Sequence, residues 1–475
     1  MTAARADRSP TDTGSDLGRL LRLAAPAVLS YLLSSAYRVN DQFWIQGLGQ
    51  EAQSAMAAAT FVAIANFALP FLAAAGALSL VSRAVGAGDE AFARTASRHA
   101  LGLALVLGIA VALAARPLAG PLADLLALEG GTKTAFVDYI AALFTTAPVL
   151  FVVPVLDHVF IGRGRTIVPM VLQAVAVTAN TVLNPLAIYG SGTESAMELG
   201  AWGERIDGFA LALGLEGGLG MEGAAWATGA SRAAALAIGL VWLARTTGTS
   251  PLPRLAIDGE LLRRIVRIST PVSLSIALYA FVYWALFAFV LVRLDDAVKA
   301  GLGIGFLVLE GVAFPTLLGL SMAASSLCGQ AIGAADRPRL ERTLKVAVRA
   351  NFAAGALFVV LFQVCAHPVA ALFTDDAKVH AEIVLYARIV GLSQVFVAFE
   401  TLWDKVLMAS GRTRPIAWIT GIGNGLRIPL ALLLADTLAL GAAGVWWAIV
   451  ATTLAKSLAL WWAARDEAWK RGESG

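Results

Sequence analysis

The chain has 475 residues, of which 58% are hydrophobic and only 15% are charged. A soluble domain of average composition carries about 25% charged residues, so these values exclude an ordinary soluble protein and indicate a protein with many membrane spans. The formal net charge of +3 is small, and no nucleic-acid partner is expected. The two cysteines, Cys328 and Cys365, lie far apart in apolar sequence and are expected to be buried and unreactive.

The first apolar stretch, residues 20–46, is long enough to cross a hydrocarbon core of about 30 Å as a helix. Asp41 lies about 32 Å along this helix from its basic end. A carboxylate there costs several kcal/mol unless it faces a cavity, pairs with a cation or takes up a proton. Arg38 shares its helix face, because the two residues are spaced i, i+3. Two interpretations stay open: Asp41 is a proton or cation site, or Arg38 and Asp41 form a structural ion pair.

Further apolar runs of similar length follow, so the chain is expected to be an all-α membrane protein with twelve transmembrane helices. The twelve runs are residues 20–46, 55–80, 97–115, 136–160, 167–189, 220–244, 264–292, 301–325, 347–366, 381–409, 415–435 and 441–463. An even number of spans places both termini on one side, and most of the 36 Lys and Arg residues then fall on that side. The positive-inside rule makes that side the cytosol. Residues 1–16 and 465–475 are expected to be cytosolic tails, the first of them disordered, and no signal peptide is recognised.

Four short motifs occur twice, in the same order. The pairs are Arg22–Pro26 with Arg267–Pro271, Ala84–Asp89 with Ala331–Asp336, Gly164–Thr166 with Gly411–Thr413, and Gly220–Ala227 with Gly441–Ala448. This repetition predicts two pseudo-symmetric six-helix bundles in parallel orientation, residues 17–245 and 261–464, with the substrate path between them. The linker is expected at residues 246–260, where Pro251 and Pro253 interrupt the helical pattern.

The fifth and sixth spans place polar residues at the depth of Asp41. Gln173, Asn180 and Asn184 form a stripe on the fifth span, and the two asparagines lie about 22 and 28 Å from its start. Thr228 reaches a similar depth in the sixth span. We expect these residues to share one chamber with Asp41 in the outer half of the bilayer. The alternative is that the amides only join helices through hydrogen bonds.

The sequence assigns a role less clearly to the other ionisable residues in the spans. Glu310, in the eighth span, is a candidate for the coupling site. The charged residues of the tenth span are Glu400, Asp404 and Lys405. They form either a second coupling site or a neutralised internal network. Asp157, near the cytosolic end of the fourth span, is expected to be a surface group paired with Arg163.

Signals of catalysis are weak throughout the chain. No HExxH, GxSxG, P-loop or paired CxxC motif occurs, and these are the patterns that place metals, nucleophiles or phosphates in many enzymes. We therefore expect no catalytic residues, no cofactor and no enzyme activity.

Several of these motifs together resemble the multidrug and toxic compound extrusion (MATE) transporters, within the multidrug/oligosaccharidyl-lipid/polysaccharide exporter superfamily. The resemblance covers nearly the whole chain, from Leu17 to about Trp462. The motifs that carry it are Pro26 with Asn40-Asp41, Ser82–Asp89, Gly164–Pro169, Asn180 with Asn184-Pro185, and Gly329–Ala334.

This resemblance implies an ion-coupling site around Asp41. In the family the acidic residue of the first span binds the coupling ion, a proton or sodium, and its protonation is linked to bending of that span at the proline, here Pro26. The residues that match one branch are Asn180, Asn184 and Thr228. Asn184 stands where that branch usually has Asp, and Tyr283 stands where a branch with a sodium site in its second half has Glu. Glu310 resembles an acidic position of some members.

The function that the resemblance implies is a cation-coupled antiporter in the inner membrane. It would export amphipathic, often cationic drugs or toxic metabolites in exchange for protons or sodium, as a monomer surrounded by membrane lipid. The rival is a lipid-linked oligosaccharide flippase, which needs cations to bind pyrophosphate. The cations that keep this rival open are Arg38, Arg232, Lys405 and Arg427. The groups toward which they point would distinguish the two functions.

Overall fold

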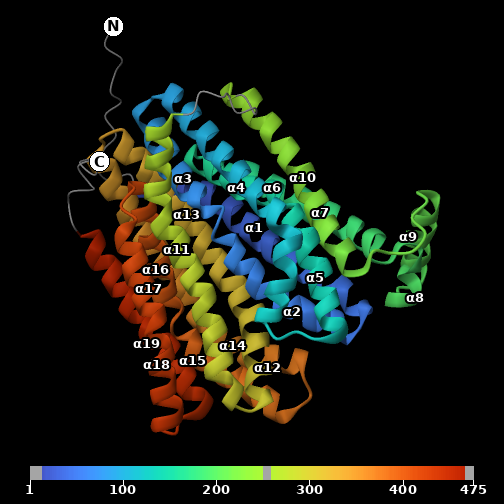
Figure 1. The fold of residues 1–475 in the computed structure, drawn as a ribbon. Coiled ribbons are helices and arrows are strands. Elements are labelled where there is room, and N and C mark those ends of the chain that lie inside the picture. Colours follow the sequence, from blue (N-terminus) through green and yellow to red (C-terminus); the bar gives the residue numbers. More distant parts are fainter. Residues whose placement is uncertain (1–12, 250–257, 466–475) are drawn as a thin grey trace.

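A computed structural model of the chain describes residues 13–249 and 258–465. Within these residues the structure consists of helices and their connections, without a β-strand. The helices form two lobes that lie side by side, an N-terminal lobe coloured blue to green and a C-terminal lobe coloured yellow to red (Figure 1). Most of the expected linker 246–260 and of the two expected tails lies outside the described residues.

Within the described residues, ten α-helices belong to the N-terminal half of the chain. They are α1 (Thr13–Ile45), α2 (Gln50–Phe67), α3 (Phe71–Ala87), α4 (Glu90–Leu125), α5 (Gly130–Thr145), α6 (Ala147–Gly162), α7 (Ile167–Tyr189), α8 (Thr193–Met197), α9 (Ala201–Ala212) and α10 (Gly220–Thr247). The short helices α8 and α9 project sideways from this lobe (Figure 1). Asp207 ties them together, since its carboxylate accepts a hydrogen bond of 2.8 Å from the backbone N–H of Thr193.

The part of the C-terminal half that the structure describes, residues 258–465, contains nine α-helices. They are α11 (Gly259–Phe289), α12 (Asp296–Ile304), α13 (Gly311–Gly333), α14 (Arg337–Phe373), α15 (Ala377–Gly391), α16 (Gln394–Ser410), α17 (Arg414–Gly425), α18 (Arg427–Leu432) and α19 (Gly441–Ala464). A π-helical segment, Gly305–Glu310, joins α12 to α13, and a second one, Leu433–Thr437, follows α18.

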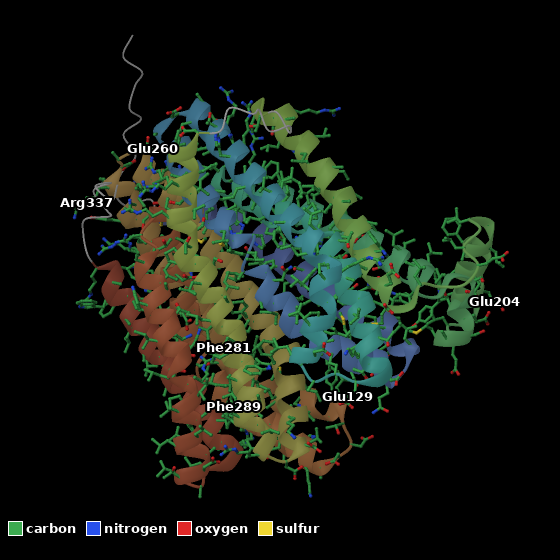
Figure 2. The ribbon with its side chains drawn as sticks, in the orientation of Figure 1. Glu129, Glu204, Glu260, Phe281, Phe289 and Arg337 are labelled. Atoms are coloured by element: carbon green, nitrogen blue, oxygen red, sulfur yellow. The ribbon has the colours of Figure 1, made fainter. Side chains whose placement is uncertain are left out.

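The described residues contain nine helical segments long and apolar enough to cross a membrane, or twelve if three bent pairs each count as one span. The pairs are α2 with α3, α5 with α6, and α15 with α16, bent by 43°, 57° and 52°. These twelve segments correspond one to one with the twelve predicted runs, so the predicted fold class is confirmed. Large apolar side chains on their outer faces, such as Phe281 and Phe289 of α11 (Figure 2), are more than half exposed and suit contact with lipid.

Two of the bends fall at equivalent places in the two halves of the chain. Thr146 separates α5 from α6, and Ser393 directly precedes α16. These residues stand at the same sequence distance from the repeated glycines Gly164 and Gly411. The structure therefore repeats in its irregular positions as well as in its helices, as expected for a parallel repeat.

Helix α1 begins at Thr13, whereas the sequence suggested a disordered tail up to residue 16. Asp16 explains the longer helix, because its carboxylate lies 3.7 Å from a guanidinium nitrogen of Arg19 and 3.3 Å from that of Arg342 in α14. The second partner is more than three hundred residues away in sequence, so the sequence pattern alone did not show it.

The two lobes meet in what we call the terminal seam, at the end of the bundle where α1 begins and α3, α13 and α16 end. The seam is held by side chains that bond to backbone groups of the other lobe. These hydrogen bonds run from Ser79 Oγ to Ala409 O (3.0 Å), from Gln330 Nε2 to Gly162 O (3.2 Å), and from Ser326 Oγ to Ile161 O. Gly86 and Gly333 let α3 and α13 touch backbone to backbone there. This end of the molecule, the terminal face, is closed in this structure.

Candidate functional site

Helices α1, α7 and α10 bring the predicted polar residues of the N-terminal lobe together. Gly223 allows the close approach of α10 to α7, since a Cβ there would lie 2.5 Å from the carbonyl carbon of Ala187. Asp41 of α1 is 7% exposed. Asn184 of α7 is fully buried, and its Nδ2 donates a hydrogen bond of 2.8 Å to Asp41 Oδ1. This hydrogen bond fixes the orientation of the Asp41 carboxylate.

Asn180 is held one helical turn before Asn184 by several neighbours. Its Oδ1 accepts hydrogen bonds from Asn184 Nδ2 at 3.1 Å and from Asn40 Nδ2 at 2.6 Å. Asn40 is in turn fixed by Trp44 Nε1, which donates to Asn40 Oδ1 at 3.2 Å, and by the hydroxyl of Thr181 at 3.3 Å. Trp44 and Thr181 were not singled out from the sequence, and their spacing relative to Asn40 and Asn180 is the signal that could have found them.

Thr228 of α10 directs its buried hydroxyl toward the carboxylate of Asp41, although the two groups do not reach the geometry of a full hydrogen bond and no other described residue bonds to this hydroxyl. Its carbonyl oxygen accepts hydrogen bonds from Ser231 Oγ at 3.0 Å and from Tyr37 OH at 3.4 Å. The hydroxyl oxygen is therefore available to a ligand next to a carboxylate. Oxygen donors of this kind suit a proton carried on Asp41, or a small hard cation such as sodium.

Arg38 does not compensate the charge of Asp41 directly. It is exposed, and its guanidinium donates a hydrogen bond of 3.1 Å to Ser35 Oγ one turn earlier on α1. Among the described residues no ion pair joins Arg38 to Asp41. Of the two interpretations drawn from the sequence, the structural ion pair is therefore not the arrangement that this structure adopts.

Gln173 makes no hydrogen bond to Asp41, Asn180, Asn184 or Thr228, although the sequence placed it on the same stripe as the two asparagines. Its Nε2 donates to Asp157 Oδ2 at 3.4 Å, and its Oε1 accepts from Arg232 Nη1 at 2.6 Å. The predicted pairing of Asp157 with Arg163 is wrong, because Arg163 bonds to Glu90 of α4 at 2.9 Å. The close packing of α6 on α4 supplies this nearer carboxylate.

Glu310 lies in the C-terminal lobe, away from the Asp41 group. It ends the π-helical segment that joins α12 to α13, and its Oε1 accepts a hydrogen bond of 3.0 Å from Tyr386 OH. The charged residues of the tenth span are paired. Lys405 lies 2.6 Å from Asp404, and Lys456 of α19 lies 2.7 Å from Glu400. The neutralised network is thus the arrangement that the structure contains.

Arg427, at the start of α18, is the polar centre of the C-terminal lobe. It is 2% exposed. Its guanidinium donates to Thr452 Oγ1 at 3.2 Å, to Tyr283 OH at 3.2 Å and to Thr453 Oγ1 at 3.4 Å. All three hydrogen-bond partners are neutral, the guanidinium also lies over the Tyr283 ring, and its charge interacts with that of Glu310.

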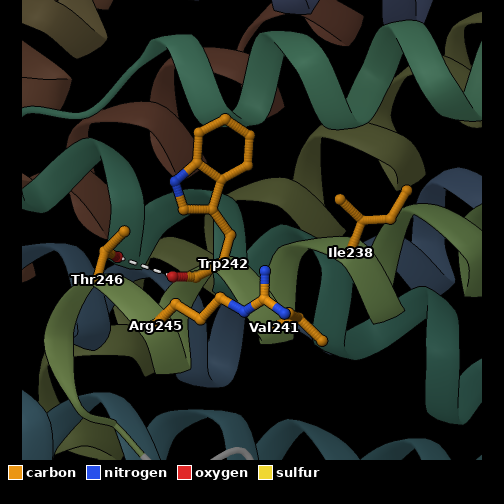
Figure 3. A pocket seen from close by; sticks show the side chains of 5 residues that line it. All are labelled: Ile238, Val241, Trp242, Arg245 and Thr246. Atoms are coloured by element: carbon orange, nitrogen blue, oxygen red, sulfur yellow. Dashed lines mark hydrogen bonds between the residues drawn. The ribbon is translucent and has the colours of Figure 1, made fainter.

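A surface hollow on α10 does not belong to this site. It is lined by residues of that helix alone, among them Trp242 and Arg245, near the end of the helix at Thr247 (Figure 3). Arg232 and Thr228 lie about 22 and 28 Å from that end of α10, at about 1.5 Å per residue. The hollow is a feature of the outer surface of one helix. The described residues also contain no group of three or more His, Cys, Asp or Glu that could hold a metal.

Comparison with known proteins agrees with this architecture. The MatE family model matches residues 26–186 and again residues 271–433, once in each lobe. A probable multidrug resistance protein NorM of Thermotoga maritima is 24% identical over 453 residues, which are 92% of this chain and 90% of that protein. An FAD transporter of Shewanella oneidensis is 24% identical over 369 residues, 76% of each chain.

A solved structure has the same fold. It is an outward-facing multidrug resistance MATE family transporter of the MOP superfamily, and it superposes with a TM-score of 0.83 at 22% identity over 98% of this chain and 100% of that chain. The resemblance drawn from the sequence is therefore confirmed. Since the two family matches together cover most of the sequence, the chain belongs to the MatE family, whose members are transporters and not enzymes.

Proposed function

We propose that the protein is a cation-coupled antiporter that exports amphipathic, often cationic compounds in exchange for protons or sodium ions. The observation that carries this proposal is the buried carboxylate of Asp41, bonded to Asn184 and next to the unpartnered hydroxyl of Thr228. An ionisable group within a membrane protein marks an ion or substrate path. Such a carboxylate binds a proton, a metal cation or an organic cation, and these ligands exclude one another.

Mutual exclusion at Asp41 supplies the coupling. A ligand changes the balance between two transporter states only by its different affinity for them. A proton or sodium ion bound at Asp41 removes the charge that attracts an organic cation. The coupling ion and the organic cation therefore do not occupy the site at the same time. The terminal seam closes one end of the bundle in this structure, which fits one of the two states that alternating access requires.

Pro26 gives α1 a place to bend between these states. It lies inside the continuous helix Thr13–Ile45 and leaves one backbone carbonyl without its helical partner. Two residues later, Val28 packs against Gly319 of α13 at the boundary of the lobes. A bend at Pro26 would therefore change the contact of α1 with the other lobe at the same time as the position of Asp41.

The arrangement of the cations favours the antiporter over the lipid-linked oligosaccharide flippase. A pyrophosphate group needs cations whose donors are available. Arg232 is bonded to Gln173, Lys405 to Asp404, and Arg427 to three hydroxyl groups. Arg38, which is exposed, is the cation of this set that remains available for an anion.

The membrane placement follows from the charge distribution. Basic residues gather on the side of the termini, so we propose that this is the cytosolic side of the inner membrane and that the protein works there as a monomer in contact with lipid. Export then runs from the terminal face toward the opposite face. The named relatives suggest which substrates to test first, organic cations and also a flavin nucleotide such as FAD.

Transport by the purified protein in proteoliposomes tests the proposal. Accumulation of a fluorescent organic cation is measured under an imposed pH gradient and, separately, under a sodium gradient, for wild type, Asp41→Asn and Asp124→Asn. Asp124 is an exposed carboxylate paired with Lys133 and serves as the control. We expect wild type and Asp124→Asn to transport under one of the gradients, and Asp41→Asn to lose transport while keeping its melting temperature.

Either of two results would overturn the antiporter. Wild type that moves no cation under either gradient removes the substrate class, and FAD and a lipid-linked anion are then tested in the same vesicles. Transport by Asp41→Asn at the rate of wild type would show that Asp41 does not couple the two fluxes.

A further inference from the structure

Asp157 of α6 is a half-buried carboxylate of the N-terminal lobe that the Asp41 site does not use. Its Oδ2 accepts a hydrogen bond of 3.4 Å from Gln173 Nε2. Its Oδ1 is buried and has no hydrogen-bond partner among the described residues. A buried carboxylate oxygen without a donor is costly while it carries charge. Binding a proton removes that cost.

Gln173 connects Asp157 to the group around Asp41. The amide accepts a hydrogen bond of 2.6 Å from Arg232 Nη1. The guanidinium of Arg232 lies 4.4 Å above the ring of Tyr37, and the positive charge of Arg232 acts on both Asp41 and Asp157. One cation thus stands between two carboxylates.

These groups are arranged along the axis of the bundle. With a rise of 1.5 Å per residue, Asp157 lies about 8 Å from the end of α6, and Gln173 about 9 Å from the start of α7, both near the terminal face. Arg232 lies about 22 Å from the end of α10, in the middle of the membrane. Asp41 stands in the last turn of α1, toward the opposite face. The series therefore leads from the Asp41 site toward the terminal face.

The other ionisable groups around Asp157 do not neutralise it. Tyr31 of α1 faces it and interacts with its charge. His158, the next residue, is turned to its own helix, with Nδ1 2.7 Å from the carbonyl oxygen of Pro154, and the charge of Lys405 of α16 acts on it. Among the described residues, Arg232 is the charged group that acts on Asp157.

We propose that Asp157 is a second proton-carrying carboxylate of the N-terminal lobe, which takes up a proton and releases it toward the terminal face. Arg232, which keeps its own proton, couples the charge state of Asp157 to that of Asp41. This inference rests on the proposed antiport and specifies the proton as its ion. Arg232 balances one negative charge. When Asp41 and Asp157 are both ionised, the three residues together carry an excess negative charge that attracts an organic cation. When both carboxyl groups are protonated, the three residues carry a positive charge that repels an organic cation.

Infrared spectroscopy of the protein in liposomes tests the assignment without a substrate. A protonated carboxyl group has a carbonyl stretching band that the carboxylate lacks, so difference spectra between low and high pH count the carboxyls that take up protons. The variants are Asp157→Asn, Asp157→Glu, Asp41→Asn and Asp404→Asn. Asp404 precedes Gly411 by the same interval as Asp157 precedes Gly164, and its ion pair of 2.6 Å with Lys405 makes it the matched control.

We expect Asp157→Asn and Asp41→Asn each to remove part of the band, Asp157→Glu to keep it at a shifted frequency, and Asp404→Asn to leave it unchanged. A spectrum of Asp157→Asn identical to that of wild type would overturn the proposal. If Asp157→Asn does not fold, the spectrum of Asp157→Glu decides instead: a carbonyl band at the frequency of wild type, without a shift, would overturn the proposal. Wild type that fails to transport any cation but shows the Asp157 band refutes the antiport alone.

Discussion

Gly333 occupies the tightest contact of the terminal seam, where α13 meets the backbone of α3. A Cβ added at Gly333 would lie 2.6 Å from the carbonyl carbon of Arg83 and 2.7 Å from its Cα. Carbon atoms in van der Waals contact are about 3.5 Å apart. The obstacle is backbone and cannot rotate away, so Gly333→Ala requires α3 and α13 to separate by about 1 Å.

The cost of this separation falls on the closed state alone. Overpacking of this size costs about 1–3 kcal/mol. At about 1.4 kcal/mol per factor of ten, the closed state should lose about 5- to 140-fold in population relative to a state in which the terminal face is open. A substitution at Gly120 of α4 is the matched control, because nothing lies within 4 Å of a Cβ built there.

Hydrogen exchange of the protein in lipid nanodiscs measures this shift. Backbone amides of residues 79–87 and 326–333 should exchange faster in Gly333→Ala by the same factor, because opening of the seam exposes both helix ends. Gly120→Ala should exchange like wild type. Equal exchange rates in Gly333→Ala and Gly120→Ala would refute the claim that this contact closes the terminal face.

Three further outcomes are expected. Lys456→Met leaves Glu400 unpaired inside the C-terminal lobe and should destabilise the protein by about 3–5 kcal/mol. Its melting temperature in detergent should fall and largely recover on adding Glu400→Gln; no recovery would contradict the ion-pair explanation. Asn184→Leu removes the hydrogen bond of 2.8 Å to Asp41 and should lower gradient-driven transport at least tenfold, about 1.4 kcal/mol, at unchanged protein level. Backbone amides of Val379 and Lys378 hold the pKa of Asp376 below its usual range. The hydrogen bonds from these two amides to the Asp376 carboxylate, which cap the start of α15, therefore contribute fully above a pH of about 3.9. They are lost as the pH falls through the lowered pKa of Asp376. Hydrogen exchange of the first turn of α15 should rise over this pH range in wild type and stay constant in Asp376→Asn.

The sequence predicts most of the architecture because membrane helices are specified locally. A run of apolar residues must satisfy its own backbone hydrogen bonds in lipid, so length and composition already determine a helix. The depth of a residue along a helix also follows from counting, and for this reason Asp41, Asn180, Asn184 and Thr228 could be expected in one layer. The structure places these four residues together.

The side chains that bond to one another between helices could not be predicted by counting residues in this way. Sequence position gives the depth of a side chain but not its direction around the helix axis relative to a distant neighbour. Asp157 and Arg163 are near each other in sequence and at similar depth, yet Arg163 turns to Glu90 and Asp157 turns to Gln173. The direction is fixed by tertiary packing, which a single sequence does not contain.

The two lobes enclose opposite charges between equivalent spans of the repeat, although Asp41 and Arg427 themselves lie on different spans of their halves. In the N-terminal lobe, α1, α7 and α10 enclose the carboxylate of Asp41. In the C-terminal lobe, the equivalent spans α11, α17–α18 and α19 enclose the guanidinium of Arg427, bonded to Tyr283 and Thr452. The parallel repeat therefore preserves the backbone arrangement and inverts the charge at its centre.

Under the proposed antiport, this difference in charge favours one lobe for an organic cation. Two interhelical spacings of about 8–10 Å put the lobe centres on the order of 20 Å apart. At an effective dielectric constant of about 20, a unit charge at that distance contributes about 0.8 kcal/mol, or roughly a factor of four in affinity. Arg427 repels an organic cation from its own lobe and adds this much to the preference for Asp41. For an anion the two signs reverse. Under the proposed antiport we therefore expect the N-terminal lobe to receive the organic cation, whether the coupling ion is a proton or sodium.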